Sequence, residues 1–333
     1  MKHTKTIVAI CYDFDGTLSP KYMQDYSFLP GLQQADREDF WKKSNADAKK
    51  HQADQILMYM KRMIERAKNS NMQTKRDAIV AHGKKIKFFD GVSGWFKRIN
   101  ACGDRLGLTI EHYIVSSGLK EMIEGSKIGD RFKEIYACSF YYDKDGIPVW
   151  PAQAVNFTTK TQFLFRINKG ITDISDTKKI NDYQPPEKRR IPFERMIYLG
   201  DGETDIPCMK LVKSQGGYSV AVYDPCNGKK RKDCLKLMDH TRVSCVCPAD
   251  YRKGSQLDTV VQRMLKAIAA NADLAKVIEE VPNSIQQDSQ KKTESEQHPT
   301  EIHSPTSGEE NRNRPPDIGL HESGPGVTNP KSS

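Results

Sequence analysis

The sequence contains no long apolar run. Across 333 residues the mean hydropathy is −0.68, and no apolar stretch approaches the ~20 residues that a membrane-spanning helix needs. The first apolar stretch, residues 7–11, ends two residues before Asp13, which is too short for the core of a secretory signal peptide, and no small-residue cleavage site follows it. The composition therefore excludes a membrane span and argues against export by that route.

Cysteine is also scarce, with eight residues in the chain, well below the density of a disulfide-stabilised scaffold. Cys11 and Cys208 lie in apolar or motif segments, as buried reduced thiols do. The later cysteines lack the Cys-x₂₋₄-Cys spacing of zinc sites; they are Cys226, Cys234, Cys245 and Cys247. We therefore expect reduced thiols, a cytoplasmic protein and no zinc centre.

Residues 283–333 lack aromatic side chains altogether and contain only five large aliphatic residues. Such a segment cannot bury enough apolar surface to offset the conformational entropy lost on folding. We expect a disordered tail to which neither a fold nor a chemical role is assigned.

Positive charge is concentrated in one part of the chain. The net charge is +9, yet residues 283–333 hold five Lys or Arg against eight Asp or Glu. Residues 37–88, in contrast, hold fourteen basic residues against six acidic ones. A local positive field attracts anions such as phosphorylated metabolites or nucleic acid, although a solvated helical surface explains the same pattern.

The rest of the chain alternates between short apolar runs and amphipathic segments. This alternation predicts an α/β fold, a Rossmann-like, mostly parallel sheet with helices on both faces. Ligands of such sheets bind at the C-terminal ends of the strands. The expected strands are residues 7–12, 108–115, 135–142, 196–199 and 218–223, and the clearest expected helices are 33–50, 56–67, 92–101, 160–169 and 255–280.

Reactive polar side chains follow three of these strands, namely Asp13 and Asp15, Ser116 and Ser117, and Asp201 and Asp205. Asp13 and Asp15 point the same way in an extended segment, because side chains alternate with a period of two. Two carboxylates so close repel each other and need a cation or a shared proton. Oxygen ligands without a nearby His or Cys favour Mg²⁺ over zinc.

These segments resemble the haloacid dehalogenase-like (HAD) hydrolases. Residues 13–18, DFDGTL, resemble the first motif of that family, and Ser116 after an apolar strand resembles the second. Lys160 resembles the third motif, and residues 200–205, GDGETD, resemble the fourth. The resemblance covers residues 5–270, apart from a helical insert.

The resemblance implies a domain organisation. Residues 1–18 and 88–282 would form the catalytic core, and residues 19–87 would form the helical cap that many phosphatases of this family carry between the first and second motifs. The turn at residues 116–118, Ser-Ser-Gly, is similar to the Ser-Gly-Gly of the phosphoserine phosphatase branch, which favours that branch.

The resemblance also implies roles for the acids. Asp13 would be the nucleophile that forms an aspartyl-phosphate, and Asp15 would act as general acid and then general base. Mg²⁺ would be held by the Asp13 carboxylate, the Asp15 backbone carbonyl and Asp201, with Asp205 supporting it through water.

The phosphate ligands implied by the resemblance are Ser116 and Lys160. Ser117 is an alternative to Ser116, since the register of the turn is uncertain by one residue. Lys169 competes with Lys160, but its place before Gly170 is typical of a cation at a helix C-terminus.

We therefore expect a Mg²⁺-dependent phosphatase acting on small phosphomonoesters. One alternative is a basic binding protein that uses the same fold to contact nucleic acid or an acidic partner, which the full set of expected catalytic residues disfavours. Another is a phosphotransferase that passes the phosphoryl group to an acceptor other than water. The sequence specifies no oligomeric state.

Overall fold

The computed structural model describes residues 5–296 and is built on a seven-stranded sheet in the order β4-β3-β2-β1-β5-β6-β7. All neighbouring strands are parallel except the antiparallel β3–β4 hairpin. This confirms the predicted Rossmann-like, mostly parallel sheet. The strands are β1 (Thr6–Tyr12), β2 (Leu108–Leu119), β3 (Glu134–Tyr142), β4 (Pro148–Gln153), β5 (Met196–Gly200), β6 (Tyr218–Tyr223) and β7 (Cys245–Pro248).

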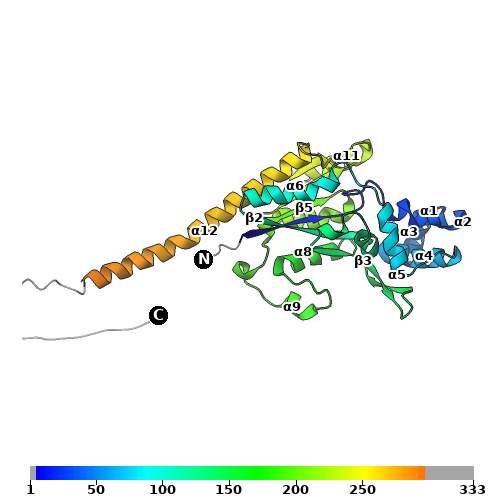
Figure 1. The fold of residues 1–333 in the computed structure, drawn as a ribbon, viewed down its shortest axis with the longest axis horizontal. Helices are drawn as coiled ribbons and strands as arrows, with labels where there is room; N and C mark the ends of the chain where they lie inside the picture. The colour runs from blue at the N-terminus through cyan, green and yellow to red at the C-terminus, as the bar shows by residue number, and fades with distance from the viewer. Residues whose placement is uncertain (1–4, 297–333) are drawn as a thin grey trace, which may run out of the picture. The chain divides into compact units, whose positions relative to one another are not determined.

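Helices cover both faces of the sheet, with α6 and the first part of α12 over one face and α8 over the other (Figure 1). None of the helices between residues 5 and 296 combines the length and apolar character needed to cross a membrane. The helices are α1 (Phe28–Gly31), α2 (Gln34–Arg37), α3 (Phe40–His51), α4 (Gln55–Asn69), α5 (Arg76–His82), α6 (Val92–Arg105), α7 (Lys120–Glu124), α8 (Thr159–Lys169), α9 (Thr177–Asn181), α10 (Ile206–Ser214), α11 (Gly228–Asp239) and α12 (Gln256–Glu296). Short 3₁₀ turns are η1 (Met23–Tyr26), η2 (Gly83–Lys85), η3 (Gly129–Arg131), η4 (Pro186–Lys188), η5 (Phe193–Arg195) and η6 (Glu203–Asp205).

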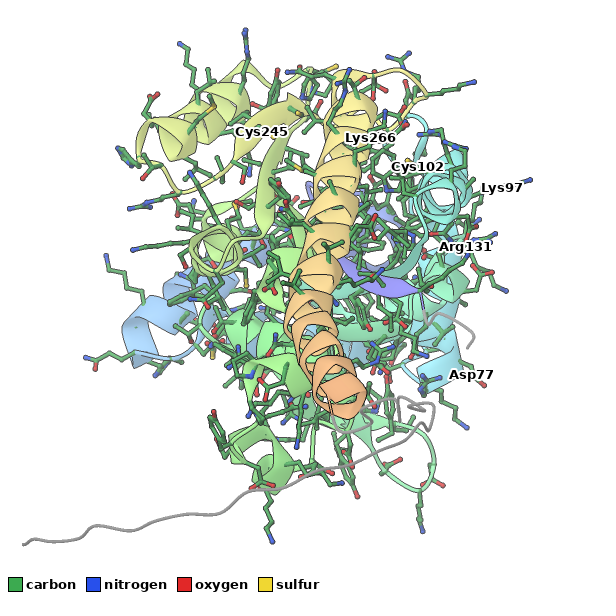
Figure 2. The ribbon with its side chains drawn as sticks, turned by 90° about the vertical axis from the view of Figure 1, so that its left-hand side faces the viewer. Asp77, Lys97, Cys102, Arg131, Cys245 and Lys266 are labelled. Carbon is green, nitrogen blue, oxygen red and sulfur yellow. The ribbon has the colours of Figure 1, made fainter. Side chains whose placement is uncertain are left out.

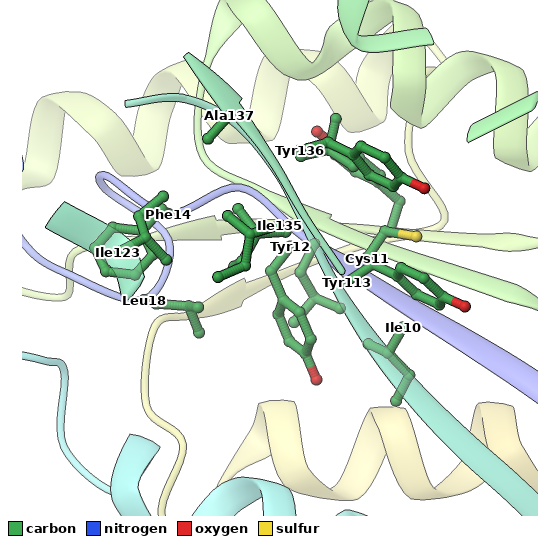
Figure 3. Close-up of a cluster of buried hydrophobic side chains, with 14 of the residues drawn as sticks. Ile10, Cys11, Tyr12, Phe14, Leu18, Tyr113, Ile123, Ile135, Tyr136 and Ala137 are labelled. Carbon is green, nitrogen blue, oxygen red and sulfur yellow. The ribbon is translucent and has the colours of Figure 1, made fainter. Parts of the chain in front are cut away.

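The core is centred on β1, whose side chains from Val8 to Tyr12 are fully buried. Figure 3 shows residues of this strand among aliphatic and aromatic neighbours from β2 and β3. The Tyr12 hydroxyl accepts a hydrogen bond from Trp95 Nε1 at 2.9 Å and lies 2.9 Å from His112 Nδ1. These bonds satisfy the buried hydroxyl, as burial of a tyrosine requires.

The helices follow from the hydrophobic spacing of the sequence. In α6, Trp95 and Ile99 are buried four residues apart, while Lys97 between them points outward (Figure 2). In α4, the Asp54 side chain accepts hydrogen bonds from the amides of Ile56 and Leu57 at 2.8 and 3.0 Å. That cap satisfies two of the amide donors left free at a helix N-terminus.

Helices α1 to α5 form an insert between β1 and α6, and they lie beyond the C-terminal end of β1 (Figure 1). The insert leaves and rejoins the core at one point, because the Phe89 amide donates a hydrogen bond to the Leu18 carbonyl at 3.0 Å. On the far side of the insert, the Tyr59 hydroxyl donates to the Ser117 carbonyl at 2.7 Å. The insert occupies the part of the chain, residues 19–87, for which the sequence analysis predicts a cap, and its role as a cap stays a prediction.

The structure also differs from the sequence prediction. It contains α9, α11 and β7, which the sequence analysis did not identify, and α12 continues to Glu296, past residue 283 where a tail without a fold was expected. Residues 283–296 contain neither Gly nor Pro and several good helix formers, so the helix continues although the polar composition from residue 283 onward indicated a tail without a fold. The remainder of the expected tail lies outside the described residues. By contacts, the chain divides into two units, Met1–Ile278 and Glu279–Ser333.

A close backbone contact docks the insert on the core. At Gly125, after α7, a Cβ would lie 1.8 Å from the carbonyl oxygen of Val80 in α5. Nearby, Arg76 Nη2 of α5 donates to Glu124 Oε2 of α7 at 2.5 Å. The two helices therefore meet at a spacing that only glycine permits at position 125.

We expect the Gly125→Ala variant to be less stable than the wild type by about 1–3 kcal/mol, because the added methyl group must push α5 away from α7. Urea unfolding measures this difference. The control is Gly94→Ala in α6, where the nearest heavy atom to an added Cβ is 3.7 Å away and a gain of roughly 0.5–1 kcal/mol is expected. Equal stability of Gly125→Ala and wild type would contradict the docking role.

Candidate active site

The three strands whose ends carry reactive side chains are neighbours in the sheet. β1 lies between β2 and β5, and the Asp13 amide extends the pairing by donating to the Leu199 carbonyl of β5 at 2.9 Å. The chain builds one half of the sheet outward from β1 through β2, then returns to β5 for the other half. The ends of β1 and β5 therefore flank the topological switch point, where ligands of such sheets bind.

Asp13 and Lys160 form the centre of the site. Lys160, near the start of α8, has no exposed surface, and its ammonium lies 3.0 Å from Asp13 Oδ1 and 2.7 Å from Asp205 Oδ1. Lys169, the competing lysine, lies at the C-terminal end of α8 and donates to the carbonyls of Ile180 and Asp182, both at 2.7 Å. The structure thus brings Lys160 to the acids and places Lys169 elsewhere.

Asp205 is held by donors from several directions. Its Oδ1 accepts from the Tyr198 hydroxyl at 2.7 Å in addition to Lys160, and its Oδ2 accepts from the Gly202 amide at 3.2 Å. Sequence reasoning missed Tyr198. Tyr198 lies two residues before Gly200, so the two residues face the same side of β5. This spacing is the sequence signal that could have placed Tyr198 near the fourth motif.

Burial controls the protonation of the central pair. Burial, opposed by Lys160 and reinforced by the neighbouring Asp205 and Asp201 charges, raises the pKa of Asp13 to about 7. Burial lowers the pKa of Lys160, but the Asp13 and Asp205 carboxylates outweigh it, so the pKa lies above its ordinary value. Lys160 therefore stays a cation, and it is the charge that opposes protonation of Asp13.

Asp15 lies next to the cap. Its Oδ1 accepts a hydrogen bond from the Met23 amide of η1 at 3.0 Å. Burial and the Asp13 charge raise the pKa of Asp15 well above its ordinary value. A raised pKa of this kind favours the protonated carboxyl group, the form that a general acid needs.

The two candidate serines occupy the end of β2. Ser116 is buried, and its Oγ accepts from the Gly118 amide at 3.1 Å. Ser117 Oγ is buried without a hydrogen-bond partner, while its carbonyl accepts from Tyr59 of the cap. Among the side-chain contacts of residues 5–296, neither serine is hydrogen-bonded to Asp13, so the choice between them stays a prediction.

Asp201 approaches the first motif across a glycine. Gly16 has a φ of +80°, and a Cβ there would lie 2.3 Å from Asp201 Oδ2. A glycine at this position therefore provides both the left-handed turn and the space for the carboxylate. Asp201 Oδ2 is also 2.8 Å from the ammonium of Lys230 in α11, a contact that the sequence analysis did not anticipate.

The acids form a group suited to a divalent cation. Asp13, Asp201 and Asp205 each offer one carboxylate oxygen, and these oxygens all lie within 4.8 Å of one another. Burial raises the pKa of Asp201, with Lys230 opposing it, so ionising Asp13 and Asp201 together carries a cost that a bound cation would reduce. An all-oxygen donor set of this kind fits Mg²⁺. The Asp15 side chain is not part of this group of oxygens.

Related proteins were found by sequence and by structure. An uncharacterized protein of Borreliella burgdorferi is 28% identical over 281 residues, which cover 77% of this chain and 96% of the relative. A HAD family hydrolase from Salmonella enterica serovar Typhi has 16% identity and a TM-score of 0.46, covering 66% of this chain and 63% of that one. A phosphoserine phosphohydrolase-like protein from Francisella tularensis has 17% identity and a TM-score of 0.42, covering 73% of this chain and 95% of that one. The likeness to these two structures concerns the fold alone.

The family assignment comes from the sequence match. The haloacid dehalogenase-like hydrolase family matches residues 10–210, a span that contains Asp13, Lys160, Asp201 and Asp205. The acids that the match spans are the ones that the fold gathers at its switch point. The chain therefore belongs to the haloacid dehalogenase-like hydrolases.

Proposed function

We propose that the protein is a Mg²⁺-dependent phosphatase that hydrolyses small phosphomonoesters through an aspartyl-phosphate on Asp13. The observation that carries the proposal is the contact between buried Asp13 and Lys160 at 3.0 Å, beside the carboxylates of Asp201 and Asp205. A carboxylate paired with a fixed cation and an ion site suits phosphoryl transfer, where positioning and charge neutralisation dominate.

In the first step, a carboxylate oxygen of Asp13 attacks phosphorus and the bond from phosphorus to the ester oxygen breaks. Asp15 donates its proton to the departing alkoxide, which leaves as an alcohol. The raised pKa of Asp15 favours the protonated form that this step requires. The Met23 amide on Asp15 Oδ1 orients the carboxyl group, so that the proton is available on the side of the leaving group.

In the second step, water attacks phosphorus and gives its proton to the Asp15 carboxylate, while the bond from phosphorus to Asp13 breaks. Inorganic phosphate leaves, and Asp13 and Asp15 return to their starting states. An alcohol in place of water would make the same intermediate a phosphotransferase intermediate. The cap limits access to this step, because Tyr59 and Met23 tie it to the ends of β2 and β1.

Mg²⁺ would be held by Asp13 and Asp201 together with the Asp15 backbone carbonyl, with Asp205 supporting the site. It would supply positive charge to the phosphoryl oxygens. Lys160 adds a second fixed charge, and Ser116 or Ser117 would donate a hydrogen bond to the same group. Asp205, which already accepts from Tyr198, Gly202 and Lys160, chiefly holds the Lys160 ammonium in place.

Asp13→Asn should lower kcat for p-nitrophenyl phosphate in Mg²⁺ by at least about a thousandfold, because the amide cannot act as the nucleophile. Steady-state kinetics measure the loss. Asp104→Asn is the matched control, since Asp104 forms only an exposed ion pair with Lys5, and it should retain wild-type activity. Retention of more than a few per cent of activity by Asp13→Asn would refute the nucleophile assignment.

Asp15→Asn should slow turnover least for esters with good leaving groups, because those alkoxides need little help from a proton donor. The measurement compares kcat/KM of the variant and the wild type over a series of aryl and alkyl phosphates of differing leaving-group acidity. A loss of equal size across the series would show that Asp15 is not the general acid.

Activity should fall as the pH drops through the pKa of Asp13, which is about 7 without a cation, because the nucleophile must be ionised. A divalent cation favours the ionised carboxylate, so raising the Mg²⁺ concentration should move the acidic limb of the kcat/KM profile to lower pH. Profiles recorded at low and at saturating Mg²⁺ test this. An acidic limb that does not move would contradict a shared site for Asp13 and the ion.

A further inference from the structure

Four consecutive cationic residues, 229–232, open helix α11. Lys229, Arg231 and Lys232 are exposed, and Lys230 is half-buried. Positive charge at a helix N-terminus opposes the helix dipole. The four cations therefore do not stabilise the helix through its dipole, and the contact that the Lys230 side chain makes needs another explanation.

Lys230 reaches into the catalytic site. Its ammonium lies 2.8 Å from Asp201 Oδ2, and the Asp201 side chain is only 11% exposed while that of Lys230 is 45% exposed. One helical turn later, Cys234 Sγ lies 3.8 Å from the Asp201 carbonyl oxygen, so this face of α11 packs on the fourth motif. Lys230 is thus partly exposed to solvent while its ammonium contacts Asp201, one of the candidate metal ligands.

The contact conflicts with a bound ion. Asp201 Oδ2 belongs to the carboxylate that would hold Mg²⁺, and a lysine ammonium and a divalent cation at one carboxylate repel each other. In the protein without the ion, Lys230 neutralises the nearly buried Asp201. When the site is loaded, that neutralisation is no longer needed, and the ammonium is free to take another anionic partner.

The insert approaches this lysine at Tyr22. Tyr22, which precedes η1, is 55% exposed and packs on Trp41 of α3 with ring centroids 4.9 Å apart. Burial raises the pKa of the Tyr22 hydroxyl, and the Lys230 ammonium is close enough to oppose that shift. Because the Lys230 side chain is 45% exposed and its ammonium lies 2.8 Å from Asp201, the leaving group of a phosphomonoester bound at Asp13 would lie within reach of Lys230.

We propose that Lys230 is a specificity-determining residue: it pairs with Asp201 in the metal-free protein and pairs with a second anionic group of the substrate when a divalent cation is bound. The substrate class is a phosphomonoester whose leaving group carries a further phosphate or carboxylate. This inference rests on the proposed phosphatase function. It assigns Lys230 no part in the bond-breaking steps.

The first test measures Mg²⁺ binding to the substrate-free, full-length protein by calorimetry. Lys230→Met should bind Mg²⁺ about tenfold more tightly than the wild type, because a competing charge-assisted contact at Asp201 is gone. Lys229→Met, which removes the adjacent exposed cation, should bind within about twofold of the wild type. Unchanged affinity in Lys230→Met would overturn the proposal.

The second test compares three substrates with similar leaving alcohols: propyl phosphate, 3-phosphooxypropanoate and propane-1,3-diyl bisphosphate. In the wild type, kcat/KM should be higher for at least one of the two substrates with a second anionic group than for propyl phosphate. Lys230→Met and Lys230→Gln should lower that ratio about tenfold, and Lys229→Met should preserve it. The substrate whose ratio falls identifies the second anion as carboxylate or phosphate.

A ratio that stays the same in both Lys230 variants would overturn the specificity role, even where all three esters are hydrolysed. Failure of the wild type to hydrolyse any ester would overturn the proposed function instead, and the calorimetric comparison would still decide whether Lys230 competes for Asp201. Melting curves of both Lys230 variants establish that the fold is retained, and Lys230→Gln keeps the hydrogen-bonding capacity without the charge.

Discussion

The candidate active site depends on one buried ammonium between two carboxylates. Lys160 has no contact with solvent, and it lies 3.0 Å from Asp13 and 2.7 Å from Asp205. Taking such charges out of water is costly unless each finds close, hydrogen-bonded partners. Tyr198 and the Gly202 amide supply the partners that Asp205 still needs. The contact therefore fixes α8 against the ends of β1 and β5, and the positions of the other acids follow from it.

The parts of the site that could be predicted are those that follow strands. Asp13 and Asp201 each stand directly after a buried apolar run, and a parallel sheet brings such ends to one edge. The alternation of runs and amphipathic segments was enough to predict that sheet. Lys160 lies far from either motif in sequence, and its prediction depended on the family resemblance; the structure places its ammonium beside Asp13.

Other features have no local signature. Lys230 stands in a run of cations in which nothing marks one residue as turned inward, and the helix that presents it was itself not predicted. In the sequence, Tyr198 looks like an ordinary core residue. The partner of its hydroxyl, Asp205, lies seven residues later in η6, and only the folded structure brings the two together. In α12 the scarcity of large apolar residues after position 282 indicated a tail without a fold, but residues 283–296 lack Gly and Pro and continue the helix.

The hydrogen bond from the Phe89 amide to the Leu18 carbonyl has a consequence for how this architecture can change over time. Because the two ends of the insert meet, it connects β1 to α6 as a short loop would. The entropic cost of closing such a connection rises only slowly with its length. The insert can therefore be lengthened, shortened or exchanged for another without moving β1 or α6. A change in the insert would then leave the carboxylates at the ends of β1 and β5 where they are.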